Sequence, residues 1–183
     1  MSAHTTPMPS RAAGSAVAPD VLRRVMSRFA TGVVVLTVGG EHIRGMTANA
    51  FTSVSLSPPL VLCCVAHSAV MHGALTATGA FGVSVMGADQ EHVARHFADK
   101  RRPDGRAQFE SFGWHSGPRT GAPLIGGALA WLECEVSAVH TAGDHSVIVG
   151  TVLSGDTAGD GSGLLFYGGA FRRLAPFDAL EAG

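Results

Sequence analysis

The sequence has little charge, few cysteines and no long apolar segment. Only 15% of its 183 residues are charged and the formal net charge at pH 7 is −1, so no basic surface is expected for nucleic acid or an anionic membrane. Three cysteines do not form a disulfide framework and suit a reducing compartment. The first residues lack the apolar core of a secretory signal, and no run approaches membrane-spanning length. We expect a cytoplasmic protein whose partners are small molecules or proteins.

Motifs of the common nucleotide-binding and hydrolytic enzymes are also missing. There is no G-x-G-x-x-G between a strand and a helix, no G-K-[ST] phosphate loop and no G-x-S-x-G elbow. No segment resembles a nucleophile with its base and orienting carboxylate, or the paired carboxylates of a glycosidase. A hydrolase is therefore not expected.

The composition supports one globular domain. Hydrophobic residues make up 46% of the chain, which is enough for one sizeable core. Residues 1–18 are rich in Ser, Thr, Ala and Pro without periodicity, and they predict a disordered tail. The domain is expected over residues 19–176, with a short tail over 177–183.

The stretch Gly45–Ser57 organises the predicted fold. Its even positions are mostly apolar and its odd positions are mostly Thr, Asn and Ser, with a break around Phe51–Thr52, which is a strand period. One face would present small hydroxyl and amide groups that could bond the edge of a flat polar ligand. An ordinary solvent-facing strand rich in Ser and Thr is the alternative.

Elements before and after this stretch follow from periodicity and turn residues. A helix that begins at Asp20 should lie across one face of a sheet. The run Val33–Val38 predicts a buried strand that forms a hairpin with the stretch from Gly45. The apolar run Leu60–Ala66 predicts a strand buried on both sides, with Cys63 and Cys64 as packing residues.

Two further helices are expected, each with a possible ligand. Ser68 is a candidate N-cap for the first, which Gly79 ends, and this helix start could bind an anion or only water. Asp89 could cap the second, which carries His92 and His96 through about Ala98. We do not expect a metal there, because the H-E-x-x-H arrangement is missing. The following basic segment 99–106 is either a solvated loop or a loop that reaches for phosphates.

The second half of the chain is dominated by strands. Alternation from Ala128 predicts one long strand, Gly143–Asp144 a turn, and Ser146–Leu153 the next strand. A loop over 155–163 and a turn at Gly168–Gly169 separate two more strands. Short helices among many strands joined by hairpin turns predict a mainly β, antiparallel Greek-key barrel with a few flanking helices.

Chemistry is therefore expected from a bound molecule. A hydroxyl-rich strand face, a helix start, a basic loop and one His beside an Asp suit a planar phosphorylated cofactor that brings its own reactivity.

These residues together resemble the flavin reductase-like family, the short reductase components that supply reduced flavin to two-component monooxygenases. Each segment alone is a weak signal, but their order and spacing are specific. The resembling segments are R-F-A-T-G-V from Arg28, the stretch from Gly45 through P-P-L-V-L, D-Q-E-H-V-A-R-H-F-A from Asp89, G-A-P-L-I-G-G-A-L-A-W-L-E-C from Gly121, A-G-D-H from Ala142, and L-L-F-Y-G-G-A-F-R-R-L from Leu164.

The resemblance implies the FMN-binding split-barrel fold, a homodimer, and a set of site residues. His145 of the G-D-H segment would lie near the nicotinamide. Ala50 departs from the Ser found in many relatives, so flavin affinity could be reduced. The implied flavin-binding residues are Thr47, Ala48, Asn49, Ala50, Ser53, Val54, Ser55, Ala66, Ser68, Phe97 and Lys100.

The implied activity is that of an NAD(P)H:flavin oxidoreductase. Hydride would pass from nicotinamide C4 of NADH or NADPH to N5 of FMN or FAD, and reduced flavin would diffuse to a partner monooxygenase. Two alternatives remain from the residues alone. One is an FMN-binding electron carrier, and the other is a split-barrel flavoenzyme that keeps its flavin and acts on another substrate.

Overall fold

The computed structural model describes residues 16–158 and 161–174, so most of each predicted tail lies outside the described residues. The helices are α1 (Pro19–Met26), α2 (Val70–Thr78) and α3 (Glu91–Ala98), with 3-10 turns η1 (Gly40–His42) and η2 (Gly105–Phe109). The strands are β1 (Thr31–Gly32), β2 (Val34–Val38), β3 (Arg44–Ala48), β4 (Phe51–Leu56), β5 (Pro59–Ala66), β6 (Ala80–Val85), β7 (Trp114–Ser116), β8 (Pro123–Ile125), β9 (Ala130–Ala142), β10 (His145–Thr157), β11 (Leu164–Tyr167) and β12 (Ala170–Arg173).

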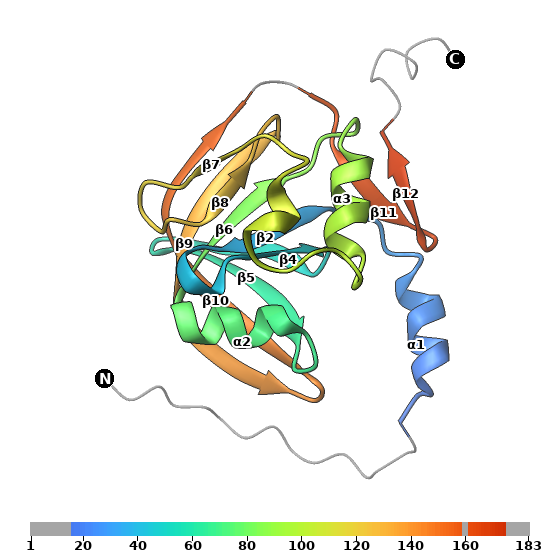
Figure 1. Cartoon of the computed structure of the whole chain (residues 1–183). Coiled ribbons are helices and arrows are strands. Elements are labelled where there is room, and N and C mark those ends of the chain that lie inside the picture. The colour runs from blue at the N-terminus through green and yellow to red at the C-terminus, as the bar shows by residue number, and fades with distance from the viewer. Residues whose placement is uncertain (1–15, 159–160, 175–183) are drawn as a thin grey trace.

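The central element is a seven-stranded antiparallel sheet in the order β3-β2-β6-β9-β10-β5-β4 (Figure 1). The predicted hairpin between Val33–Val38 and the stretch from Gly45 is confirmed, because Val34 pairs with Ala48 and Val38 with Arg44. The turn at Gly143, which has a φ of +64°, joins β9 to β10 as predicted. The mainly β, antiparallel expectation is therefore confirmed.

The two outer strands of this sheet are consecutive in the chain. Only Asn49 and Ala50 separate β3 from β4, although the two strands lie at opposite ends of the strand order. Three peptide units span at most about 11 Å, so the sheet must curl until its edges approach each other. We call this place, at Asn49–Ala50, the seam. The strand break predicted around Phe51–Thr52 is wrong, because the break falls at the seam.

The sheet separates two hydrophobic clusters. The inner one lies inside the curl, and the outer one lies between β2 and α3. Strand β2 is buried at all five positions because Val34 and Leu36 face the inner cluster while Val35 faces the outer one. This explains its continuous run of apolar residues.

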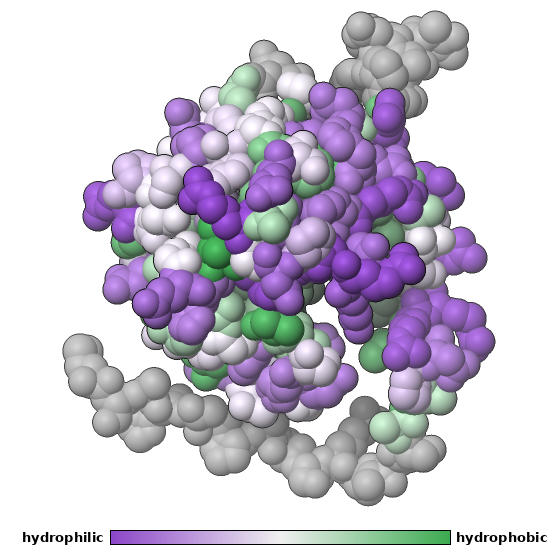
Figure 2. All heavy atoms as spheres, viewed as in Figure 1, coloured by the Kyte–Doolittle hydropathy of each residue, from purple (hydrophilic) through white to green (hydrophobic). Residues whose placement is uncertain are grey.

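Helix α1 does not cover the sheet, and that prediction is wrong. In Figure 1 it stands at the side of the barrel, below β11 and β12, and none of its residues is buried. Its apolar residues Leu22, Val25 and Met26 and the following Phe29 are between 52% and 65% exposed. In the view of Figure 2 the helix presents mainly hydrophilic residues, so its apolar side faces elsewhere.

The predicted helix caps also need correction. The N-cap positions are Ala18, Ala69 and Gln90, and none of them makes a side-chain capping bond. Asp20 lies within the first turn of α1 and pairs with Arg24 at 3.3 Å. Ser68 and Asp89 lie two residues before their helices, so neither side chain occupies the capping position. Gly79 does end α2, with a φ of +69°.

The prediction that Leu60–Ala66 is buried on both sides is wrong. Strand β5 is fully buried only on the side of Val61, Cys63 and Val65, while the alternate positions are half-buried. On β9, Glu133 is only 2% exposed, which is unusual for a carboxylate. No helix within the described ranges is both long and apolar enough to cross a membrane.

Candidate functional site

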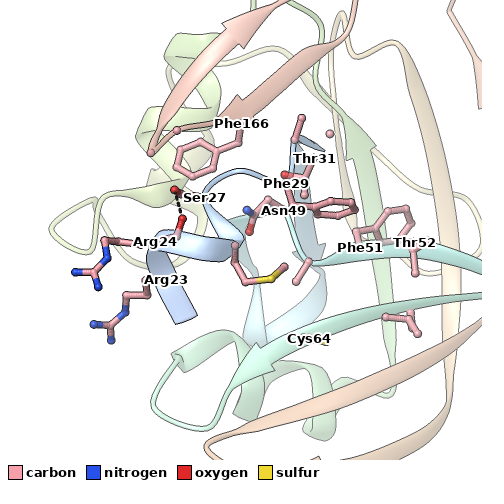
Figure 3. A pocket seen from close by; sticks show the side chains of 17 residues that line it. Arg23, Arg24, Ser27, Phe29, Thr31, Asn49, Phe51, Thr52, Cys64 and Phe166 are labelled. Atoms are coloured by element: carbon pink, nitrogen blue, oxygen red, sulfur yellow. Dashed lines mark hydrogen bonds between the residues drawn. The ribbon is translucent and has the colours of Figure 1, made fainter. Parts of the chain in front are cut away.

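A cavity of about 940 Å³ lies between α1 and the seam. Figure 3 shows that Phe29, Asn49 and Phe51 gather between the helix and the strands, whereas the guanidinium groups of Arg23 and Arg24 point outward. The remaining lining residues are Met26, Ser27, Ala30, Thr31, Gly32, Ala50, Thr52, Leu62, Cys64, Phe166, Gly168 and Gly169.

Most of the cavity wall is apolar or aromatic, with a few polar groups. The Oγ1 of Thr31 is buried and has no hydrogen-bond partner among the described residues. An unpaired buried hydroxyl costs about 1–3 kcal/mol, so a ligand that bonds it would recover that cost. A volume of this size, with an aromatic lining and few polar groups, fits a flat heterocyclic ligand.

The face of β5 that lines the cavity extends along the strand toward His145. Leu62 and Cys64 line the cavity, and Ala66 lies two residues further on the same face, about 7 Å away. Ala66 is the direct antiparallel partner of His145, so the two side chains share this face. Ser146, the next residue, pairs with Val65 and points to the buried side.

His145 is held by its neighbour. Its Nδ1 lies 2.8 Å from the Oδ1 of Asp144, which is fully solvent-accessible. The hydrogen bond with His145, followed by its charge, lowers the pKa of the Asp144 carboxyl. Because Nδ1 is bonded to this carboxylate, Nε2 of His145 is left for a ligand on the face shared with Ala66.

The predicted flavin residues fall into separate places. Asn49 and Ala50 line the cavity, and Ala66 and Ser68 lie at the far end of β5 near His145. Ser53, Val54 and Ser55 follow along β4, beyond Thr52 at the cavity. Val54 is 49% exposed.

Of the predicted flavin residues only Asn49 and Ala50 line the cavity, and four of the others have quite different surroundings. The Thr47 hydroxyl donates to the Ala94 carbonyl of α3 at 2.7 Å, and Ala48 belongs to the inner cluster. The ring of Phe97 is fully buried beneath Gly45. Lys100 is exposed in the loop after α3.

The basic segment is partly structural. Arg102 donates to the carbonyls of Gly45 and Asp99, and Arg44 pairs with Asp104 at 2.7 Å. Burial, and then the nearby charge of Arg44, lowers the pKa of Arg102. Neither prediction for the whole segment is complete, because Arg102 packs inward whereas Lys100 and Arg101 are solvated.

The histidine pair on α3 is satisfied by protein groups. The Nε2 of His96 lies 2.8 Å from the Gln108 carbonyl, and the Nδ1 of His92 lies 3.2 Å from that of Asp89. No group of three metal-ligating side chains occurs within residues 16–158 and 161–174.

Several cavity residues are not identified by the sequence reasoning. Thr31 and Phe166 fall in segments used for the family resemblance, but their side chains meet only after β1 pairs with β11. Cys64 is treated as a packing residue, yet it lines the cavity. Cys63 is a packing residue as predicted, and burial raises the pKa of its thiol to about 12.

Comparison with known proteins defines the class as a flavin reductase with a split-barrel fold. The crystal structure of BorF, the flavin reductase component of a bacterial two-component tryptophan halogenase, has a TM-score of 0.83 at 51% identity, covering 86% of this chain and 98% of that one. The NADH:FAD oxidoreductase SgcE6 of Streptomyces globisporus C-1027, solved in complex with NAD and FAD fragments, has a TM-score of 0.82 at 51% identity, covering 90% and 99%.

The chain belongs to the flavin reductase-like domain family, whose model matches residues 26–175. An NADH-dependent FAD reductase of Streptomyces globisporus is 56% identical over 155 residues, which cover 85% of this chain and 85% of that protein. The predicted fold, family and enzyme class, an NAD(P)H:flavin oxidoreductase that serves a two-component monooxygenase, are confirmed.

Proposed function

We propose that the protein reduces FAD, and also FMN, with NADH, and releases the reduced flavin to a separate flavin-dependent oxygenase. The observation that carries this proposal is the continuous face from Asn49–Ala50 through Cys64 and Ala66 to His145. The flavin supplies the hydride acceptor when bound.

The residues divide this face into two parts. The apolar cavity at the seam would hold the isoalloxazine ring, with the Thr31 hydroxyl and the Asn49 amide bonding its polar edge. His145, fixed by Asp144, would contact the nicotinamide carboxamide. Ala66 and Ser68 would follow the chain that carries the flavin phosphates, with Ser53, Val54 and Ser55 beside it.

Three predicted residues would act indirectly. Thr47 anchors β3 to α3, and Phe97 packs under Gly45, so both would hold the seam in place. Ala48 packs in the inner cluster beside them. Lys100 is solvated and would meet phosphate only at the outer end of the ligand.

We propose that α1 packs against a second copy of the chain. Leu22, Val25 and Met26 leave more than half of each side chain exposed, and Leu56 on the edge strand β4 is 93% exposed. Apolar surface of this kind favours association. We therefore propose a homodimer, and we place it in the cytoplasm, where its free cysteines Cys63, Cys64 and Cys134 stay reduced.

The test is a set of four assays that combine NADH or NADPH with FAD or FMN. Each assay is monitored by the loss of absorbance of the reduced nicotinamide. We expect turnover with NADH, faster with FAD than with FMN, and flavin that leaves the protein on gel filtration. Turnover with no pair would refute the proposal. Tightly retained flavin would instead indicate a prosthetic group.

The variant His145→Ala should raise the KM for NADH by about tenfold, the loss expected from one charge-assisted contact.

A further inference from the structure

Two imidazoles meet at one buried hydroxyl behind His145. The Oγ of Ser146 lies 3.1 Å from Nε2 of His67 and 2.9 Å from Nε2 of His72. The two rings meet edge to face, with centroids 5.1 Å apart. Ser146 itself is only 2% exposed.

A proton count limits how this group is bonded. A serine hydroxyl has one proton to donate, so it can donate to only one of the two Nε2 atoms. The other ring must then donate its own Nε2–H to the Ser146 oxygen, which can accept from one ring or from both. At least one of His67 and His72 therefore carries its proton on Nε2.

The hydroxyl joins three segments at one point. His67 lies in the turn after β5, His72 in the first turn of α2, and Ser146 at the start of β10. The backbone amide of His67 also donates to the Asp144 carbonyl at 2.9 Å. The end of the β9–β10 hairpin is therefore tied to both β5 and α2.

His145 is directly attached to this arrangement. The side chain of His145 points to the face that it shares with Ala66. Ser146 points to the opposite face, because neighbouring residues of a strand alternate. Asp144, which bonds the His145 ring, is the residue whose carbonyl accepts from His67. A shift of the hairpin end would move both the ring and its carboxylate partner.

We propose that Ser146, His67 and His72 are positioning residues, which hold the hairpin end so that His145 meets the nicotinamide. This inference rests on the proposed role of His145. None of the three residues lines the cavity. We expect them to affect the binding of NADH and to leave the binding of flavin unchanged. A displacement of about 1 Å is enough to weaken the contact between a side chain and its ligand.

The first test compares Ser146→Ala with Ser137→Ala. Ser137 on the neighbouring β9 makes a single hydroxyl bond, to the Val149 carbonyl at 3.1 Å, and it lies away from the hairpin end. Ser146→Ala should raise the KM for NADH about fivefold, the effect of one lost hydrogen bond. The kcat and the Kd for FAD should stay within about twofold, and Ser137→Ala should match the wild type.

A double-mutant cycle decides whether the effect passes through His145. In a His145→Ala background, Ser146→Ala should add little to the KM for NADH, because the group being positioned is gone. Effects that multiply fully would overturn the proposal. So would a Ser146→Ala enzyme equal to Ser137→Ala.

Two further outcomes separate this proposal from the proposed function. If the wild type consumes no NADH with any flavin, the proposed function fails at that step. If it is active, imidazole ¹⁵N spectra of the wild type should show at least one of His67 and His72 in the Nε2–H form. Both rings in the Nδ1–H form would contradict the shared hydroxyl, because it has one proton for two acceptors, whether or not any variant folds.

Discussion

The backbone amide and the hydroxyl of Thr120 both donate to one carboxylate oxygen of Glu133, each over 2.8 Å. The Arg119 amide reaches the same oxygen at 2.9 Å, and the Ser154 hydroxyl donates to the other oxygen at 2.8 Å. Burial alone raises the pKa of Glu133, but these hydrogen bonds outweigh it and lower the pKa overall. The carboxylate thus joins the turn before β8 to β9 and β10.

Glu133→Gln should destabilise the protein at pH 7 by about 1–2 kcal/mol, because the neutral amide accepts weaker hydrogen bonds than the carboxylate and must turn its NH₂ toward the Ser154 hydroxyl. Since the folded pKa of Glu133 is lowered, its stabilisation is present above the unfolded value of about 4.3 and is lost as the pH falls through the folded value. The difference in urea unfolding between variant and wild type should therefore shrink at acid pH. Glu135→Gln, at an exposed position two residues along β9, is the control, and a pH-independent difference would contradict this account.

Thr31→Val should weaken flavin binding, with a Kd about three to ten times higher, because it removes an unpaired hydroxyl from the cavity wall. The free energy of unfolding without flavin should stay the same or rise slightly. Thr78→Val is a matched control, since the Thr78 hydroxyl is also buried and unpaired among the described residues but lies on α2. Flavin fluorescence titration measures both, and equal Kd values would argue against a flavin contact by Thr31.

Arg102→Met should lower the free energy of unfolding by about 1–3 kcal/mol, because two carbonyls and the Gln108 amide oxygen lose their donor. Arg101→Met should have no measurable effect, since the Arg101 side chain is 91% exposed. Chemical denaturation compares the two variants. A larger loss of unfolding free energy for Arg101→Met than for Arg102→Met would contradict the structural role assigned to Arg102.

Leu22→Asp combined with Val25→Asp should convert the proposed dimer into a monomer, because charges would replace side chains that are 55% and 61% exposed in a single chain. Light scattering after gel filtration gives the mass directly. Val70→Asp alters an apolar residue that is 63% exposed on α2 and should leave the mass unchanged. A monomeric wild type would refute the proposed second copy.

Local patterns predicted much of the sheet. The β-branched run of β2, the hairpin of β2 with β3 and the turn at Gly143 depend on neighbours close in sequence, and all three predictions are correct. The position of α1 could not be predicted in this way. Its apolar side has no partner in the described part of the chain, so amphipathicity alone wrongly placed it on the sheet.

The site was predictable only in part. Asn49, Ala50 and His145 stand in segments that resemble the family, and the resemblance also implied Ala66; the structure places the four along one face. Thr31 and Phe166 are far apart in sequence and meet through pairing that no local pattern encodes. The burial of Glu133 likewise depends on a distant turn that folds over it.

The two-residue link at Asn49–Ala50 also restricts how a ligand enters. A connection of three peptide units spans at most about 11 Å, so the two sheet edges cannot separate further than that. The barrel side of the cavity therefore has little freedom to widen, whereas α1 on the other side has no buried residue to hold it. We expect tolerance for flavins of different length to depend on that helix and on whatever packs against it.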